Sequence, residues 1–263
     1  MRRHHDGMDL EVTLRPPRRR LLLKESRALV DLATLPLGFV GPRRSAGTDR
    51  PVLVLPGFGA GELAMRPLRR YLQRHGVNAE DWGLGTNRAG LDIPHTLADL
   101  SPGWSPRPLA RYRREGGVAF LVDRMVKRVR QRAEESGDAV ALVGWSLGGT
   151  IAREVARDLP DAVSRVITLG SPFIGGPKYT AAGRSLRERG LDVDWIEQQV
   201  RLREQRPVTV PITAVVSPTD AVVDYAAAFD HFSERVEHVE LDVAHLGMGV
   251  NRKVWKIVLE RLV

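Results

Sequence analysis

The chain contains no cysteine, and this absence removes several kinds of chemistry at once. Disulfides, thiolate metal sites and cysteine nucleophiles are all excluded. The sequence also lacks an uninterrupted apolar run long enough to cross a bilayer, and it shows no internal repeat. What is present is a chain of 263 residues with ordinary apolar and charged fractions. That length predicts one large α/β domain or two small ones with a full core.

The charge balance is basic, with a formal net charge of +8 and far more arginine than lysine. Such a balance is compatible with binding to nucleic acid or to an anionic membrane. Most of the arginines, however, fall at polar positions of expected helices, where a solvated helix face explains them. We therefore predict no nucleic-acid partner. The cluster Arg15–Arg20 is the local exception.

Residues 1–48 are expected to form a basic arm followed by a packed helix. Residues 1–20 are basic and contain proline without a sustained period, so we expect them to be mobile. Farther along, four apolar residues fall near one face of a helix, namely Leu22, Leu29, Leu32 and Ala33. This spacing predicts a helix packed on the domain. The alternative is an interfacial anchor that makes peripheral membrane contact, helped by the arginines before it.

A signal peptide is a third interpretation of the same segment. Arg19–Lys24 loosely resembles a twin-arginine signal. The charges of Lys24, Glu25, Arg27 and Asp31 interrupt the apolar stretch, and no clean small-residue cleavage site follows. We therefore expect a cytoplasmic protein.

From residue 49 onward, apolar strand segments alternate with helical patterns. The expected strands cover 51–55, 78–84, 139–143, 165–170, 210–216 and 235–241. The expected helices cover 66–75, 118–135, 150–157 and 252–262. This alternation predicts an α/β fold for residues 49–263, with a mostly parallel sheet of about six strands and helices on both faces.

Two long connections interrupt the alternation. Residues 171–207 become helical and charged with a thin apolar face, which predicts a small lid; that face consists of Leu186, Leu191, Trp195, Ile196, Val200 and Leu202. Residues 85–117 are rich in proline and glycine, and a loop of that length in a compact domain is usually functional or mobile.

The segment Gly144–Gly149 fits the pattern of a serine held on a sharp turn between a strand and a helix. An apolar run precedes it, and Ile151 and Val155 continue it at helical spacing. The small residues around Ser146 are needed because strand and helix approach closely there. Ser146 is therefore the candidate nucleophile.

A serine needs a base to take its proton and an acid to orient that base. In an open α/β sheet these groups are expected just past the carboxyl ends of strands. Asp220 is the first carboxylate after the fifth expected strand, and His245 follows the sixth. Ser146, Asp220 and His245 thus stand in nucleophile–acid–base order. Asp224 is the nearest competitor for the acid, ahead of Asp192 and Asp194 in the lid.

The other histidines have plainer explanations. His231 and His238 lie within or before the last strand, His75 ends a helix, and His4 and His5 belong to the tail. His95 lies in the long loop, where a solvated side chain is the expectation and a place beside the substrate the alternative.

The first expected strand runs into the glycine-rich segment Leu55–Gly61, where an oxyanion hole is expected. We assign one donor to the backbone N–H of Phe58 and the other to that of Leu147. A dinucleotide site is the alternative for such a loop, but its glycines are spaced G-x-G-x-G and no acidic residue closes the second strand. The sequence predicts neither a cofactor nor a metal.

Taken in order, these motifs resemble those of bacterial serine esterases and lipases of the α/β-hydrolase superfamily. The matching positions are Pro56-Gly57-Phe58, Gly144–Gly149, Ser171-Pro172, Asp220 with Val222-Val223, and His245. The resemblance spans about residues 51–262 and implies hydrolysis of carboxylic esters through a covalent acyl-enzyme. It departs from the pattern at Pro56, where many members have histidine, and in the lack of an N-terminal hairpin.

We therefore expect an esterase or lipase that acts on a small-molecule or lipid ester with an apolar acyl group. Trp145 and Phe173 are expected to contact the substrate. Acyl transfer, thioester cleavage and cofactor-free perhydrolysis are alternatives that use the same three residues. A non-enzymatic binder is a further alternative, although a binder has no need of a base beside a serine.

Overall fold

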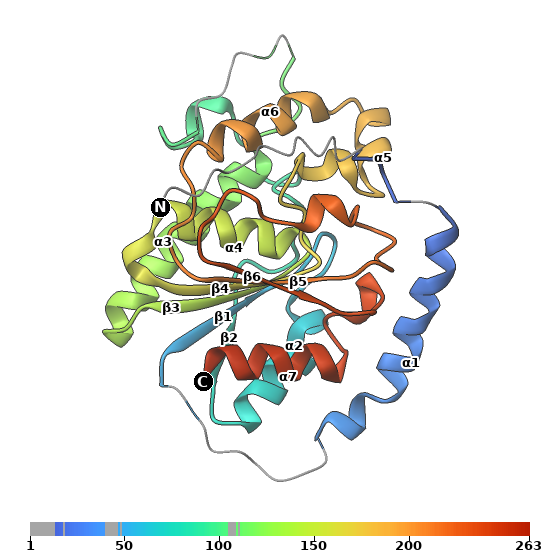
Figure 1. Ribbon diagram of the computed structural model, residues 1–263. Helices are drawn as coiled ribbons and strands as arrows, with labels where there is room; N and C mark the ends of the chain where they lie inside the picture. The colour runs from blue at the N-terminus through green and yellow to red at the C-terminus, as the bar shows by residue number, and fades with distance from the viewer. Residues whose placement is uncertain (1–13, 18, 40–46, 48, 105–108, 110) are drawn as a thin grey trace, which may run out of the picture.

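Six parallel strands form one sheet, in the spatial order β2-β1-β3-β4-β5-β6 (Figure 1). The computed structural model describes residues 14–17, 19–39, 47, 49–104, 109 and 111–263. The strands are β1 Pro51–Leu55, β2 Asn78–Asp81, β3 Val140–Trp145, β4 Val163–Leu169, β5 Ile212–Val216 and β6 Val236–Glu240. The sheet confirms the predicted fold class. Residues 1–13 of the predicted basic arm, which include His4 and His5, lie outside the described residues.

Helices cover both faces of the sheet. On one face lie α2 Glu62–Arg74 and α7 Arg252–Leu262, and on the other lie α3 Gly117–Ser136 and α4 Leu147–Asp158 (Figure 1). Trp255 of α7 is fully buried in the first of these layers, and Met125 of α3 in the second. Two separate apolar cores therefore hold the sheet between them. Short 3₁₀ turns connect the elements: η3 Leu97–Asp99, η4 Pro160–Ala162, η6 Ala226–Ala228 and η7 His245–Gly247.

The second strand is shorter than the sequence predicts, ending at Asp81 rather than at residue 84. Gly83 and Gly85 have φ angles of 71° and 73°, a backbone conformation that favours glycine and ends the strand. Trp82 is fully buried, and its Nε1–H donates to the carbonyl of Gly85 at 2.8 Å. The apolar residues that suggested a longer strand therefore pack under a tight turn.

The lid insertion forms three short helices, η5 Gly176–Tyr179, α5 Gly183–Glu188 and α6 Val193–Arg203. In Figure 1 they lie beyond α4, on the side away from the sheet. Asp192 starts α6, because its side chain accepts hydrogen bonds from the backbone N–H groups of Asp194 and Trp195 at 3.1 and 2.9 Å. A helical lid is thus present, as predicted.

The N-terminal arm consists of η1 Arg19–Ser26, α1 Arg27–Ala33 and η2 Leu35–Phe39. The prediction that Leu22, Leu29, Leu32 and Ala33 pack on the domain is wrong: the three leucines are 51%, 68% and 56% exposed, and Ala33 is exposed as well. Polar residues of η1 and α1 bind the domain instead, so the amphipathic segment is attached by its polar side. Leu35 and Phe39 of η2 pack against the core. No helix among the described residues is long and apolar enough to cross a membrane.

Candidate active site

The backbone turns sharply at Ser146, between β3 and α4. Its φ angle is 54° and its ψ angle −123°, a conformation that costs free energy for any residue with a side chain. A Cβ on Gly144 would lie 2.4 Å from the backbone of Gly148, and a Cβ on Gly148 would lie 2.4 Å from the carbonyl oxygen of Leu55. The glycines therefore allow β1, β3 and α4 to meet, which is the local geometry that the sequence pattern predicts.

His245 and Asp220 form a buried pair at the same edge of the sheet. The Nδ1 atom of His245 lies 2.7 Å from Oδ2 of Asp220, and the two side chains are 2% and 4% exposed. The other carboxylate oxygen, Oδ1, accepts hydrogen bonds from the N–H groups of Val222 and Val223 at 2.7 and 2.8 Å. Those two bonds orient the carboxylate toward the imidazole.

The competing carboxylates lie elsewhere. Asp224 accepts a hydrogen bond from the N–H of Ala227 at 3.2 Å, and burial raises the pKa of its carboxyl. Asp192 caps α6, and Asp194 forms ion pairs with Lys178 and Arg187. Of the candidate acids, the structure brings Asp220 to His245.

Trp145, the residue before Ser146, also reaches the histidine loop. Its Nε1–H donates to the backbone carbonyl of His245 at 3.1 Å, and its ring lies 5.8 Å from the imidazole. The last residue of β3 thus supports the position of His245 as well as that of Ser146.

Asn87 holds the glycine-rich loop after β1, a role that sequence reasoning missed. It is fully buried, and its Nδ2–H donates to the carbonyl of Pro56 at 2.8 Å. Its backbone carbonyl accepts from Gly59 at 2.7 Å, and its N–H donates to Ala60 at 2.9 Å. An asparagine in a loop rich in glycine and proline has the sequence signature of an ordinary turn. Only the unusual length of the loop formed by residues 85–117 indicates a functional segment.

We expect Asn87→Ala to destabilise the protein and to reduce any activity that depends on the loop carrying Phe58. The substitution leaves the carbonyl of Pro56 without its buried donor, which typically costs about 1–3 kcal/mol. Chemical denaturation measures the loss. Asn78→Ala, at an exposed position of β2, is the matched control, and an equal effect of both substitutions would contradict this role.

A cavity of about 260 Å³ lies beside Ser146 and His245. The predicted residues that line it are Phe58, Trp145, Ser146, Leu147, Phe173 and His245. The lid contributes apolar walls through Leu186, Leu191, Trp195, Ile196 and Val200, whereas Leu202, predicted for the same face, is 36% exposed. The long loop adds Leu91, Leu100 and Trp104. The two interruptions of the α/β alternation therefore build most of the apolar lining.

Residues 50–207 match the family model for the α/β hydrolase fold, which is more than half of the chain. The chain belongs to this family. The predicted superfamily is thereby confirmed.

Curated relatives match the chain over a short stretch. The pimeloyl-[acyl-carrier protein] methyl ester esterase of Sodalis glossinidius is 33% identical over 108 residues, which are 41% of this chain and 36% of that protein. The protein of the same name from Cronobacter sakazakii is 33% identical over 96 residues, 36% of this chain and 33% of that protein. The matched segment thus spans about a third of the length of these relatives.

Solved structures share the fold at low sequence identity. A structure of the metagenome-derived lipolytic enzymes LipS and LipT is 17% identical with a TM-score of 0.57, covering 83% of this chain and 93% of that one. The monoacylglycerol lipase of Paleococcus ferrophilus is 16% identical with a TM-score of 0.53, covering 82% and 95%. At these identities the likeness concerns the fold alone.

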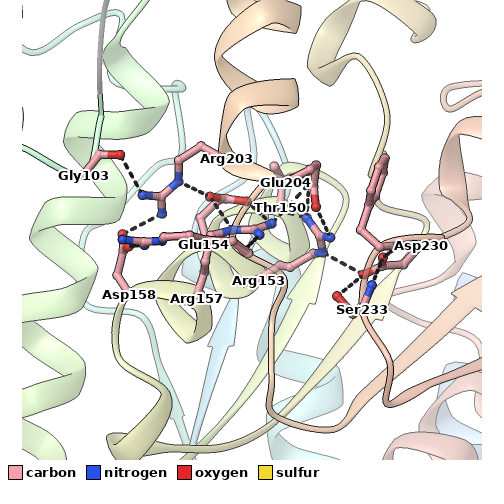
Figure 2. Close-up of polar contacts among 12 residues, drawn as sticks. Gly103, Thr150, Arg153, Glu154, Arg157, Asp158, Arg203, Glu204, Asp230 and Ser233 are labelled. Carbon is pink, nitrogen blue, oxygen red and sulfur yellow. Dashed lines mark hydrogen bonds and ion pairs between the residues drawn. The ribbon is translucent and has the colours of Figure 1, made fainter.

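A cluster of buried charges borders the cavity and joins α4 to the end of the lid (Figure 2). Arg153 binds Glu204 through two hydrogen bonds of 2.5 and 2.8 Å, and its Nε–H donates to Asp230 at 2.9 Å. Arg203 donates to Glu154 and to Asp158, both at 2.7 Å. The side chains of these arginines are at most 5% exposed.

Opposite charges balance within the cluster. Burial alone would raise the pKa of Glu154, but Arg157, Arg203 and Arg153 outweigh it and hold that pKa below its usual range. Asp230 follows the same pattern, because Arg153 overcomes the effect of burial and lowers the pKa of its carboxyl. The prediction that arginines occupy solvated helix faces is therefore wrong for Arg153, Arg157 and Arg203.

The other histidines within the described residues make structural contacts. His95 is 9% exposed, against the prediction of a solvated side chain; its ring stacks on Phe120 at 4.9 Å, and Nδ1 lies 2.7 Å from the carbonyl of Ile93. His75 ends α2 as predicted, and His238 Nε2 accepts from the N–H of Asp230 at 3.0 Å. Within the described part of the chain, no group of three or more histidine or acidic side chains is arranged to hold a metal ion.

Proposed function

We propose that this protein is a serine carboxylic ester hydrolase that acts on apolar acyl esters through an acyl-enzyme on Ser146. The observation that carries the proposal is the buried Asp220–His245 pair, whose histidine lines the same cavity as Ser146. A histidine oriented by a carboxylate is the arrangement that activates a serine hydroxyl.

In the proposed reaction, Ser146 Oγ attacks the acyl carbon while His245 Nε2 takes the hydroxyl proton. Asp220 keeps the proton of His245 on Nδ1 and stabilises the imidazolium that forms. His245 then gives the proton to the departing alcohol, and the ester bond breaks. In the second half, His245 takes a proton from water, whose oxygen attacks the acyl carbon. His245 then returns that proton to Ser146 Oγ as the bond between Oγ and the acyl carbon breaks, which releases the acid and regenerates the serine.

Backbone donors stabilise the oxyanion in this scheme. Leu147 opens α4, where the first N–H groups have no partner within the helix. Phe58 lies in the loop held by Asn87 and lines the same cavity as Leu147. Removing one such donor from a serine hydrolase typically costs about 3–4 kcal/mol of transition-state stabilisation.

The proposed substrate class follows from the cavity walls. Aliphatic and aromatic side chains of the lid and the long loop favour an apolar acyl chain, since burial of such a chain gains about 25 cal/mol per Å². The curated relatives are named for a methyl ester, which suggests that the alcohol side of the ester can be small.

A panel of p-nitrophenyl esters of increasing acyl length, together with the corresponding methyl esters, tests the proposal. We expect kcat/KM to rise with acyl length until the cavity is filled and then to fall, and Ser146→Ala to be inactive throughout. Product analysis with a competing alcohol separates hydrolysis from acyl transfer. Activity that is absent, or that survives in Ser146→Ala, would overturn the proposal.

A further inference from the structure

Glu25 of the N-terminal arm reaches both loops that carry the proposed acid and base. Its Oε1 atom accepts hydrogen bonds from the N–H groups of Ala221 and His245 at 3.2 and 3.1 Å. Its Oε2 atom accepts from the N–H of Leu246 at 2.9 Å. One carboxylate therefore links the residue after Asp220 to His245 itself, across 196 to 221 residues of sequence.

The N–H groups at His245 and Leu246 open the turn η7, and the start of such a turn leaves donors without a partner inside it. A charged acceptor makes hydrogen bonds roughly twice as strong as a neutral one. The carboxylate of Glu25 is thus well suited to fix the backbone from which the imidazole projects.

The other attachments of the arm surround the same loop. Arg27 donates to Asp242 at 2.8 Å, just before η7, and Asp31 accepts from Asn251 at 2.8 Å, just after it. A Cβ on Gly247 would lie 2.4 Å from Oδ2 of Asp31. None of the residues of α1 is buried, so this helix is attached through these polar contacts, whereas Leu35 and Phe39 of η2 pack against the core that contains Trp255.

We propose that Glu25 is a positioning residue for the Asp220–His245 pair, a role that rests on the proposed function of that pair. It keeps Nδ1 of His245 on Asp220 and leaves the other ring nitrogen to Ser146, without contact to the substrate. Loss of the carboxylate lowers the rate of the chemical step. It does not change substrate binding, which depends on the cavity.

The test compares Glu25→Ala and Glu25→Gln with Lys24→Ala, an exposed neighbour on the arm. We expect Glu25→Ala to lower kcat by about 100-fold with little change in KM, because small misplacements of reacting groups have effects of this size. Glu25→Gln, which keeps one oxygen acceptor, should fall between, and Lys24→Ala should match the parent.

An NMR measurement distinguishes a failure of the role of Glu25 from a failure of the proposed ester hydrolysis. We expect the Nδ1 proton of His245 to give a downfield NMR signal in the parent and in Lys24→Ala, and to broaden in Glu25→Ala; Asp220→Asn assigns it. An unchanged signal with an unchanged kcat would overturn the role of Glu25 alone. A parent that shows the signal but no esterase activity would overturn the proposed function and leave the positioning contact standing.

Apolar side chains are exposed on the outer side of the arm, a feature independent of the contacts of Glu25. Five apolar side chains are between 51% and 80% exposed within eleven residues, namely Leu22, Leu23, Leu29, Val30 and Leu32. The acids Glu25 and Asp31 turn inward into hydrogen bonds, whereas Lys24 is exposed. One exposed cation, Lys24, therefore lies among these apolar side chains, and the chain as a whole is basic.

We infer that this face docks on an anionic lipid surface. Buried apolar area and attraction of basic residues to anionic headgroups together provide such binding. Leu246, which is 53% exposed and lines the cavity, adjoins the arm through its bond to Glu25. Docking would thus bring the cavity mouth toward the lipid.

Sedimentation with vesicles tests the docking. We expect retention on phosphatidylglycerol–phosphatidylcholine vesicles, weak retention on phosphatidylcholine alone, and at least a tenfold weaker retention for the double variant Leu29→Ser, Leu32→Ser. Leu63→Ser, at a leucine of α2 that is 75% exposed, should bind as the parent does. No retention of the parent, or a dimer in light scattering that the double variant dissociates, would overturn the inference.

Discussion

Asp220→Asn should lower kcat for ester hydrolysis by about 10⁴-fold, the loss seen when the acid of a serine triad becomes an amide. The amide oxygen can still accept from Val222 and Val223, so the loop should keep its position. The amide nitrogen then faces Nδ1 of His245 and favours the wrong tautomer. Steady-state kinetics with a p-nitrophenyl ester, compared with thermal unfolding, separates this effect from misfolding.

Asp224→Asn is the matched control for that substitution. Asp224 lies four residues along the same loop and bonds to the backbone of Ala227 rather than to His245. Its variant should keep a kcat close to that of the parent. Similar losses in both variants would mean that the loop, and not the contact between Asp220 and His245, determines the rate.

Glu204→Ala should destabilise the protein by about 3–5 kcal/mol, the usual cost of removing one member of a buried ion pair. Glu204 is the acceptor of two hydrogen bonds from Arg153 and of one from Arg157 at 3.1 Å. All three side chains are at most 4% exposed, so the lost carboxylate is removed from a site shielded from bulk water. A loss of this size lowers Tm by roughly 6–20 °C in a domain of this length.

Glu188→Ala makes the same chemical change at an exposed pair in the lid. Glu188 and Arg184 are 63% and 76% exposed, and such pairs contribute about 0–1 kcal/mol. Differential scanning calorimetry of both variants compares the buried and the exposed position directly. If Glu204→Ala unfolds at the temperature of Glu188→Ala, the buried cluster does not hold the lid on α4.

The sequence predicts well those features that follow from the order of strands and from short motifs. Parallel strands bring their carboxyl ends to one edge, so the positions of Ser146, Asp220 and His245 after separate strands predict that they lie near one another. The structure places His245 beside Asp220, and His245 and Ser146 line one cavity. The sharp turn at Ser146 could be predicted from the sequence, because close backbone contacts require the glycines beside it. The lid could be predicted because it interrupts the alternation of strands and helices along the chain.

Contacts between polar residues far apart in the chain could not be predicted. Arg153 and Glu204 are separated by 51 residues, and an arginine on a helix has the same local pattern whether it meets water or a carboxylate. Asn87 and Glu25 are further cases, since each bonds to backbone groups that carry no sequence signal. The prediction that the apolar face of the arm packs on the domain is wrong for the same reason. Helical spacing identifies an apolar face but not the direction in which it points.

Intact-mass analysis after treatment with a serine-directed phosphonate tests the central claim most directly, because it asks whether Ser146 is a nucleophile without assuming a substrate. We expect one adduct per chain in the parent, mapped to the peptide that contains Ser146, and none in Ser146→Ala. An unlabelled parent, or an adduct that persists in Ser146→Ala, would contradict the account.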